Sequence, residues 1–281
     1  MTSTVLSSVG SSSAAPATAP HTALKVARYE ISNIIRSRWL LAYCAFFFLA
    51  TDALLRFGGD GGRALLSLVS VVLFVVPLMA LVFGTTYLYD AREFTELLLA
   101  QPVGRGRLFT GLFLGLAVPL SLALLLGIGL PFAWHGVGDN AQMVTLAVLG
   151  GCGVALTLSF VAIAFLVAVR TEDRVRALGT AVGIWLVLTL LYDGLVLVGI
   201  ALLSHYPIER PVLALMVANP IDLARVLLLL RFDAGALQGY TGAVFTQFFG
   251  GAGAAIAAGI LLLWVAVPSL LGLRAFRSKD F

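Results

Sequence analysis

The chain has 281 residues, of which 60% are hydrophobic and only 11% are charged, and its mean hydropathy is +1.02. Soluble domains carry about 25% charged residues, so this composition excludes a soluble globular protein and predicts an integral membrane protein. The net charge of +4 is not gathered in a basic patch with interleaved aromatic residues, which argues against a nucleic-acid partner. The two cysteines form no CxxC motif, so neither a disulfide framework nor a thiol redox pair is indicated.

The N-terminal segment changes character near residue 22. Residues 1–22 are mostly Ser, Ala, Thr and Pro, and they lack the basic start and apolar core of a secretory signal, so we expect a disordered tail. From Thr22 to Arg38, apolar residues recur on one helical face and most of the basic residues lie away from it. This pattern predicts a basic amphipathic helix that lies on an anionic membrane surface. Residues 23–281 are expected to form a single transmembrane domain.

Six apolar runs are long enough to cross the lipid bilayer as helices, which takes about 20 residues each. They are Trp39–Leu55, Ala64–Leu88, Leu108–Pro131, Ala141–Val169, Ala177–Leu203 and Gly251–Leu273. The sequence therefore predicts an all-α polytopic membrane protein with six transmembrane helices. Most of the 18 basic residues fall in the alternate segments that share a side with both termini. This excess of Lys and Arg predicts that both termini face the cytoplasm.

The segment between the second and third spans, Tyr89–Phe109, holds the densest set of charges in the first half of the chain. Asp90 and Glu93 have the spacing of a capping box, which predicts that a new helix begins at Asp90. Pro102 and the glycines after it end this helix. About ten residues cannot cross a bilayer, so we expect the helix to lie along the cytoplasmic membrane surface.

This short helix is amphipathic. Arg92, Glu93 and Glu96 share one face, while Leu97 belongs to the apolar face that would seat the helix. The charged face is therefore available to a soluble partner. The alternative is a solvated loop helix that has no partner.

The segment before the last span is long and strongly apolar. A seventh span over Val212–Leu230 is disfavoured, because Asp222 and Arg225 would each be costly at the bilayer centre. We expect two short re-entrant helices instead, broken at Asn219 and Pro220 and dipping into the outer interface. Asp222 would then lie in the first turn of the second helix, where a carboxylate is favoured.

Two carboxylates lie within predicted spans. Asp52 is late in the first span, and Asp193 is in the fifth, directly after Tyr192. An acid inside a membrane must find a partner or water, so each is a candidate functional residue. The alternative, which applies more strongly to Asp52 than to Asp193, is a structural hydrogen bond or a side chain that reaches the interface.

Enzyme motifs are absent from the sequence. There is no GxxxxGK[ST], so the chain does not itself hold ATP phosphates, and there is no HExxH or GxSxG-like serine motif with a histidine partner. The three histidines are scattered, and four Met with two isolated Cys give little support for a soft-metal pathway. We expect no active site, no metal site and no cofactor on this chain.

Together these features resemble the permease subunits of ABC exporters of the ABC-2 type. The shared features are the amphipathic N-terminal helix, the cytoplasmic stretch with an acidic start, a Leu run and Pro-x-Gly-Arg, the six spans, and the re-entrant segment before the last one. Within this family the chain is most similar to the NosY-type permeases, the membrane part of the exporter that serves maturation of nitrous oxide reductase. The matching stretches are Gln101–Arg107, Gly179–Asp193 and Asn219–Arg225. The chain departs from relatives in its Ser/Ala tail and at Gly111-Leu112, where they usually carry a Gly-Lys pair.

The resemblance implies a role for the charged segment and a set of partners. The helix that starts at Asp90 would be the coupling helix, with Asp90, Arg92, Glu93 and Glu96 docking on a separate ABC ATPase subunit that binds ATP and Mg. The resemblance further implies a homodimer in the bacterial cytoplasmic membrane, with room for a periplasmic accessory protein.

Two functions from other classes remain open at this point. An intramembrane enzyme would use Asp193 and Tyr192, and the isolated chain would be active. A membrane scaffold would recruit a soluble complex, transport nothing, and tolerate changes at both intramembrane acids.

Overall fold

The computed structural model describes residues 37–58, 61–92, 95, 104–136, 140–202, 215–229 and 253–278, and every regular element in these ranges is a helix. The elements are α2 (Arg38–Phe57), α3 (Gly61–Asp90), α5 (Arg105–His135), α6 (Asn140–Arg170), α7 (Arg174–Leu186), the π-helix η1 (Val187–Leu191), α8 (Tyr192–Leu202), α10 (Pro220–Leu229) and α12 (Gly253–Ser278). The all-α prediction is confirmed. The predicted tail and all but the end of the predicted amphipathic helix lie outside the described residues.

Six helices in the described ranges are long and apolar enough to cross a membrane, as predicted. Five of them are α2, α3, α5, α6 and α12, and the other is the continuous run Arg174–Gly199 through α7, η1 and α8. Most of the helices extend a few residues beyond the predicted spans, because helical hydrogen bonding continues past the last apolar residue. The predicted and observed spans otherwise coincide.

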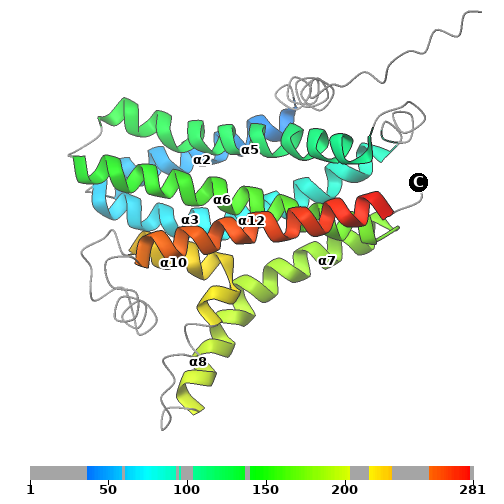
Figure 1. The fold of residues 1–281 in the computed structure, drawn as a ribbon. Coiled ribbons are helices and arrows are strands. Elements are labelled where there is room, and N and C mark those ends of the chain that lie inside the picture. The colour runs from blue at the N-terminus through cyan, green and yellow to red at the C-terminus, as the bar shows by residue number, and fades with distance from the viewer. Residues whose placement is uncertain are drawn as a thin grey trace, which may run out of the picture.

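The α6 helix lies at the centre of the bundle. It packs against α3, α12 and α5 over long stretches and also contacts α10 and the start of α7, while α2 packs mainly against α5 (Figure 1). Phe160 and Phe165 of α6 are fully buried, as are Leu112 and Leu124 of α5. The buried faces of these helices therefore form one continuous apolar core.

Small residues allow two helix pairs to approach closely. A Cβ added at Gly84 of α3 would lie 2.6 Å from Cβ of Ala164 on α6. A Cβ added at Gly127 of α5 would lie 2.8 Å from Cβ of Phe47 and 2.9 Å from the Cys44 carbonyl oxygen, both on α2. Such contacts are typical of membrane helices, whose association depends on van der Waals packing because the surrounding lipid is equally apolar.

Four phenylalanine rings join α5, α6 and α12 near one end of the bundle. The Phe109 ring lies 5.7 Å from that of Phe165 and 5.5 Å from that of Phe276, and the Phe113 ring lies 5.9 Å from that of Phe165. Aromatic pairs at these separations and tilted geometries attract each other beyond their buried area. This cluster fixes the end of α12 against the core.

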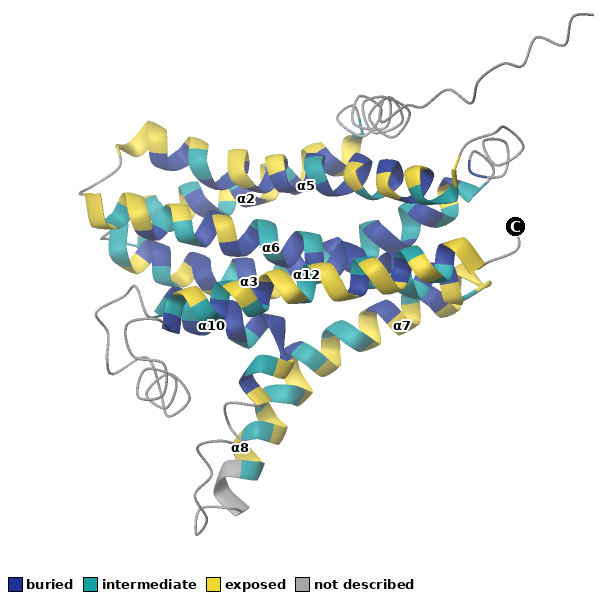
Figure 2. Cartoon of the chain, viewed as in Figure 1, coloured by how far each residue is buried: buried dark blue, intermediate teal, exposed yellow. Residues whose placement is uncertain are grey.

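The fifth span departs from the bundle. It starts beside the end of α12, and η1 and α8 lead away from the other helices (Figure 1). Only Ala177 and Ala181 of α7 are buried, and much of the surface of α7 and α8 is exposed (Figure 2). Trp185 ties α7 to α3, because its Nε1 donates to the Phe74 carbonyl at 3.1 Å and the two rings meet edge to face.

The helices alternate in direction, so their charged ends gather at one end of the bundle (Figure 1). We call it the basic end. The described arginines that it collects from five helices and the segment after α3 are Arg38, Arg92, Arg105, Arg107, Arg170, Arg174, Arg176, Arg274 and Arg277. The opposite end holds only Arg56 and Arg63 among the described basic residues of the six spans. The predicted grouping of charge is confirmed, whereas the cytoplasmic location of the basic end stays a prediction.

The contact between α3 and α6 gives a stability prediction. Gly84→Ala places a methyl group against Ala164, and neither side chain can rotate away, so the two helices must separate. Overpacking of this kind costs about 1–3 kcal/mol, and we expect a lower thermal unfolding midpoint for the detergent-purified protein. Gly179→Ala is the matched control, because a Cβ there meets nothing within 4 Å. An equal effect of the two substitutions would contradict the close approach.

Candidate functional site: two polar clusters on the fifth span

The first cluster joins the end of α3 to the turn between α6 and α7. The Tyr89 hydroxyl donates to the Thr171 carbonyl at 2.7 Å, and the Arg92 guanidinium donates to the carbonyls of Thr171 at 3.0 Å and Glu172 at 3.1 Å. The guanidinium also lies 4.0 Å from the centre of the Tyr89 ring, a cation–π distance. These contacts satisfy two carbonyl groups of the turn between α6 and α7, which lie outside both helices.

Asp90 belongs to the same cluster. Its Oδ1 accepts a hydrogen bond from Arg174 Nη1 at 2.8 Å, which links α3 to the first residue of α7. Asp173 caps α7, since its side chain accepts from the Val175 backbone N–H at 2.9 Å. We call the contacts of Tyr89, Asp90 and Arg92 with residues 171–174 the loop clamp. The loop clamp connects two polar segments at the basic end that are about 80 residues apart in the sequence.

The predicted capping box at Asp90 is wrong. Asp90 is the last residue of α3, and helical hydrogen bonding continues past it, with the Ala91 N–H bonded to the Tyr87 carbonyl at 2.9 Å. An N-cap residue must leave the helical conformation, which Asp90 does not do. Its carboxylate pairs instead with Arg174, a partner that the local spacing could not reveal.

The remaining predicted coupling residues are Glu93, Glu96, Leu97 and Pro102, and all four lie outside the described residues. Their role in docking an ATPase stays a prediction. Arg92 is described, and its guanidinium is bound within the chain by Thr171 and Glu172.

The second cluster surrounds a break in the fifth span. In η1 the Tyr192 N–H bonds to the Val187 carbonyl, five residues back, instead of to the Leu188 carbonyl as an α-helix requires. The Leu188 carbonyl accepts a hydrogen bond from Nδ2 of Asn219 at 2.8 Å. An unsatisfied carbonyl is costly in a lipid-exposed helix, so Asn219 compensates for the irregular turn.

Asn219 also begins α10. Its Oδ1 accepts from the Ile221 N–H at 3.0 Å, which is N-capping geometry, and Pro220 takes the first helical position, where a missing N–H does no harm. The predicted break at Asn219 and Pro220 is therefore present. Helical residues 215–218 precede the break, but the predicted dip of both helices into the outer interface stays a prediction.

Arg225 joins the two acids that sequence reasoning treated as separate sites. Its Nη1 lies 2.9 Å from Oδ2 of Asp193 on α8 and 3.1 Å from Oδ1 of Asp222, one turn earlier on α10. Asn219 donates to the other oxygen of Asp222 at 3.1 Å. We call Asp193, Asn219, Asp222 and Arg225 the span-break cluster. It places the single positive charge of Arg225 between two carboxyl groups.

Asp222 lies outside the six candidate spans, and its pKa is raised to about 7. The main cause is burial, which removes water from the charged form, and the neighbouring Asp193 carboxylate acts in the same direction. The Arg225 charge and the Asn219 hydrogen bond oppose this rise. The protonated form of Asp222 is therefore favoured below about pH 7.

Two further contacts tie the chain before α10 to the spans. The Tyr192 hydroxyl donates to the Leu215 carbonyl, and Trp264 Nε1 of α12 donates to the Val217 carbonyl at 2.9 Å. Tyr192 and Asp193 are thus both bonded within the protein. This arrangement supports a structural role for the two residues and gives no support to the intramembrane enzyme, whose nucleophile or base would need access to a substrate.

Asp52 has partners at the opposite end of the bundle. Its carboxylate accepts from His135 Nε2 at 2.8 Å and from Arg56 Nε at 2.9 Å. The sequence pointed to Asp52 but gave no reason to choose His135, which is the last residue of α5. Close packing of α2 against α5 brings the two together. Among the described residues, no three His, Cys, Asp or Glu side chains gather closely enough to hold a metal ion.

Comparison with known proteins gives a consistent result. Residues 24–281 match the family described as "ABC-2 family transporter protein". A protein of Pseudomonas aeruginosa described as "Probable ABC transporter permease protein NosY" is 35% identical over 237 residues, which cover 76% of this chain and 84% of the relative. A protein of Stutzerimonas stutzeri with the same description is 30% identical over 280 residues, covering 90% of this chain and 97% of the relative.

The raised pKa of Asp222 gives a pH prediction. Unfolded Asp titrates near 3.8 and folded Asp222 near 7, so the folded state binds more protons between these values. Stability is therefore greatest below pH 4 as far as this group is concerned, and it falls as pH rises to about 7, by at most roughly 4 kcal/mol. We expect Asp222→Asn to flatten the dependence of the thermal unfolding midpoint on pH between 5 and 8.

The matched control for this measurement is Asp173→Asn, because Asn caps helices about as well as Asp. This control should keep the slope of the parent protein. The prediction fails if the parent shows no decline over this range, or if Asp222→Asn declines as steeply as the control.

Proposed function

The chain belongs to the ABC-2 family of transporter proteins, and we propose that it is the permease subunit of an ATP-driven exporter. It is a multi-pass membrane protein and the membrane subunit of an ABC transporter, a role that implies an ABC ATPase as partner. In our proposal, ATP and Mg bind to that separate subunit, and this chain carries no catalytic residue. The basic end faces the cytoplasm of the bacterial inner membrane, with both termini on that side.

The observation that supports ATP-driven coupling best is the loop clamp. An ATPase that docks on the segment after α3 pushes on Tyr89, Asp90 and Arg92. Through Thr171 and Arg174 the push reaches α7 directly. Because α7 has little buried surface, it can move with less loss of packing than the central α6. ATP-dependent closure of the ATPases would thus reorient the fifth span.

We further propose a homodimer that pairs with two ATPase copies. The exposed apolar surface of α8 is suited to contact a second copy, since Leu195, Leu197 and Val198 are all more than half exposed. Cargo would pass along the dimer interface or be gated by it. The span-break cluster includes Asp193 in the first turn of α8, and it would hold that helix at a fixed angle to the bundle.

The NosY descriptions of the two relatives support a more specific role. We propose that the exporter serves the maturation of a copper enzyme, nitrous oxide reductase, and that the cargo is a sulfur species for its copper site. A periplasmic accessory protein would receive the cargo at the end opposite the basic end.

The subunit composition is the first test of this proposal. The tagged full-length chain is purified in mild detergent from its native host, and the eluate is analysed for partners and for ATP hydrolysis. We expect a stoichiometric subunit with a Walker motif and vanadate-sensitive ATP hydrolysis. A homo-oligomer without an ATPase would refute the exporter and favour the scaffold.

A charge swap tests the loop clamp separately from docking. Asp90→Arg places two arginines together at the basic end and should lower ATP hydrolysis by the purified complex, together with nitrous oxide reductase activity in the host. An exposed ion pair contributes up to about 1 kcal/mol, so we expect an effect of about fivefold. Adding Arg174→Asp restores the pair with reversed polarity and should restore both activities.

The swap also distinguishes the two roles considered for Asp90. If the partner of Asp90 is the ATPase and not Arg174, the ATPase will fail to co-purify with the double variant as it does with the single variant. Rescue by Arg174→Asp is possible only if the two side chains act on each other.

A further inference from the structure

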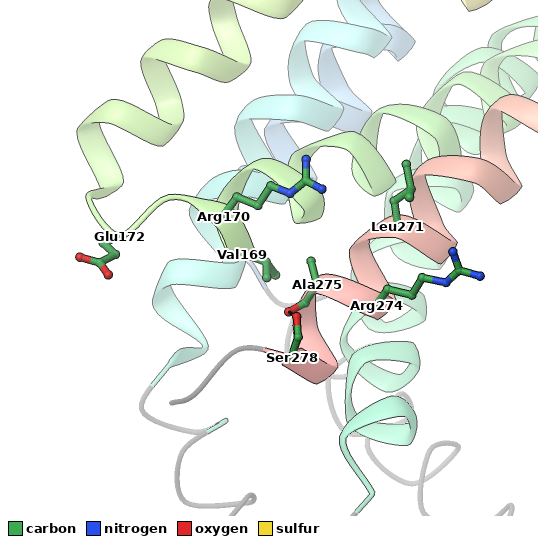
Figure 3. Close-up of a pocket in the computed structure, with 7 residues that line it drawn as sticks. All are labelled: Val169, Arg170, Glu172, Leu271, Arg274, Ala275 and Ser278. Carbon is green, nitrogen blue, oxygen red and sulfur yellow. Dashed lines mark hydrogen bonds between the residues drawn. The ribbon is translucent and has the colours of Figure 1, made fainter.

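Two cavities open along one side of α12. The larger, about 710 Å³, is lined by residues of α6, α7, η1 and α12, nearly all of them apolar, and Trp264 is the lining residue of α12 farthest from the basic end. The other, about 570 Å³, lies at the basic end between α6 and α12 and is lined by Arg170, Glu172, Arg274 and Ser278 (Figure 3). Leu271 lines both cavities. The two cavities therefore adjoin at Leu271, and together we call them the groove, with an apolar part and a basic part.

The length of this groove fits one leaflet of a bilayer. Trp264, Val267, Leu271, Arg274 and Ser278 recur every three or four residues, so they follow one face of α12. At 1.5 Å per residue, the helix rises about 15 Å between Trp264 and Arg274. The hydrocarbon core of a bilayer is about 30 Å thick, and half of that thickness is the depth of one leaflet. The arginine lies where a lipid headgroup would be.

The basic part of the groove has unpaired positive charge. Within the described ranges, neither Arg170 nor Arg274 makes a hydrogen bond or an ion pair. Figure 3 shows the Glu172 carboxylate pointing to the opposite side from both guanidinium groups. Guanidinium groups bind phosphate oxygens with charge-assisted hydrogen bonds, so this part of the groove is suited to a phosphate group.

The apolar part is left open by a glycine of α7. A Cβ added at Gly183 would meet nothing within 4 Å, and Gly183 lines the groove together with Ile184 and Val187. Protein side chains leave this space between α7 and α12 unfilled. In a membrane, apolar space that is open to the side is filled by acyl chains.

We propose that this groove binds one anionic phospholipid from the leaflet at the basic end. Arg170 and Arg274 hold its phosphate, and one acyl chain follows α12 past Leu271 to Trp264. A zwitterionic lipid places its own cation among the arginines and is disfavoured. The lipid fills the space between α7 and the bundle, so it sets the position of the helix that the loop clamp also contacts. The site does not depend on the identity of the cargo.

Tryptophan quenching tests the location of the lipid. The chain has four tryptophans, and replacing Trp39, Trp134 and Trp185 by Phe leaves Trp264 as the only reporter. The full-length variant is reconstituted into phosphatidylcholine vesicles that contain phosphatidylglycerol or phosphatidylcholine brominated on the acyl chains. We expect stronger quenching by brominated phosphatidylglycerol, with the preference reduced about fivefold by Arg170→Gln and again by Arg274→Gln.

Two matched variants separate the groove from general effects of charge and volume. Arg176→Gln removes a basic residue at the same end that does not line the groove, and it should keep the preference. Gly183→Leu fills the apolar part and should abolish preferential quenching, whereas Gly259→Leu, at an open position of α12 outside the groove, should not.

Native mass spectrometry of the parent chain gives a second measurement that needs no tryptophan replacement. From detergent with equal amounts of phosphatidylglycerol and phosphatidylcholine, we expect retention of phosphatidylglycerol that is lost in Arg170→Gln with Arg274→Gln. Equal retention and equal quenching by the two lipids would show ordinary boundary lipid and overturn the proposal. Absence of quenching by either lipid would show that a second copy or another protein covers the groove, and would also overturn it.

Discussion

The hydrogen bond from Asn219 to the Leu188 carbonyl is the contact on which the arrangement of the fifth span depends. A π-turn inside a spanning helix frees a backbone carbonyl, and lipid offers it no hydrogen-bond donor, so the protein must supply one. Asn219 can do so only if the chain before α10 returns to the middle of this span. That return places Arg225 opposite Asp193 and gives each charge a partner. A single irregular turn thus determines where residues 215–229 lie.

The fifth span is attached to the bundle at two places, by exposed contacts at the basic end and by buried contacts at the break. At the basic end the loop clamp is exposed to water, where ion pairs are weak and exchange easily. At the break, Asn219 is fully buried and its bonds are shielded from water, so they are stronger. Between these two places α7 buries little apolar surface. In the proposed exporter, a helix held in this way would pivot about the break when its exposed end is moved.

Much of this fold could be predicted from the sequence because membrane spans are encoded locally. Long apolar runs predicted the six helices. Asn219 followed by Pro220 predicted a helix start, because Asn is a favoured N-cap residue and Pro is favoured at the first helical position. Contacts between distant segments could not be predicted in the same way. Asp193 and Arg225 each stood out as a charge in apolar surroundings, yet their pairing depends on the path of the chain between them. Asp90 was misinterpreted because its spacing to Glu93 is typical of a helix start. Its partner, Arg174, is the first residue of α7 and lies 84 residues away in the sequence.

The irregular turn in the fifth span also has a consequence for chain length. A π-turn accommodates one residue more than an α-turn, so the sequence of this span contains an insertion relative to a regular helix. Each residue of an α-helix turns the next by about 100°. Deleting one residue from Val187–Leu191 would restore regular hydrogen bonding and leave Asp193 facing nearly the same way, because the five residues of the π-turn cover about the same rotation as four residues of an α-helix. The deletion would also return the Leu188 carbonyl to a helical hydrogen bond, so Asn219 would lose its acceptor in this span while Arg225 kept Asp193 within reach.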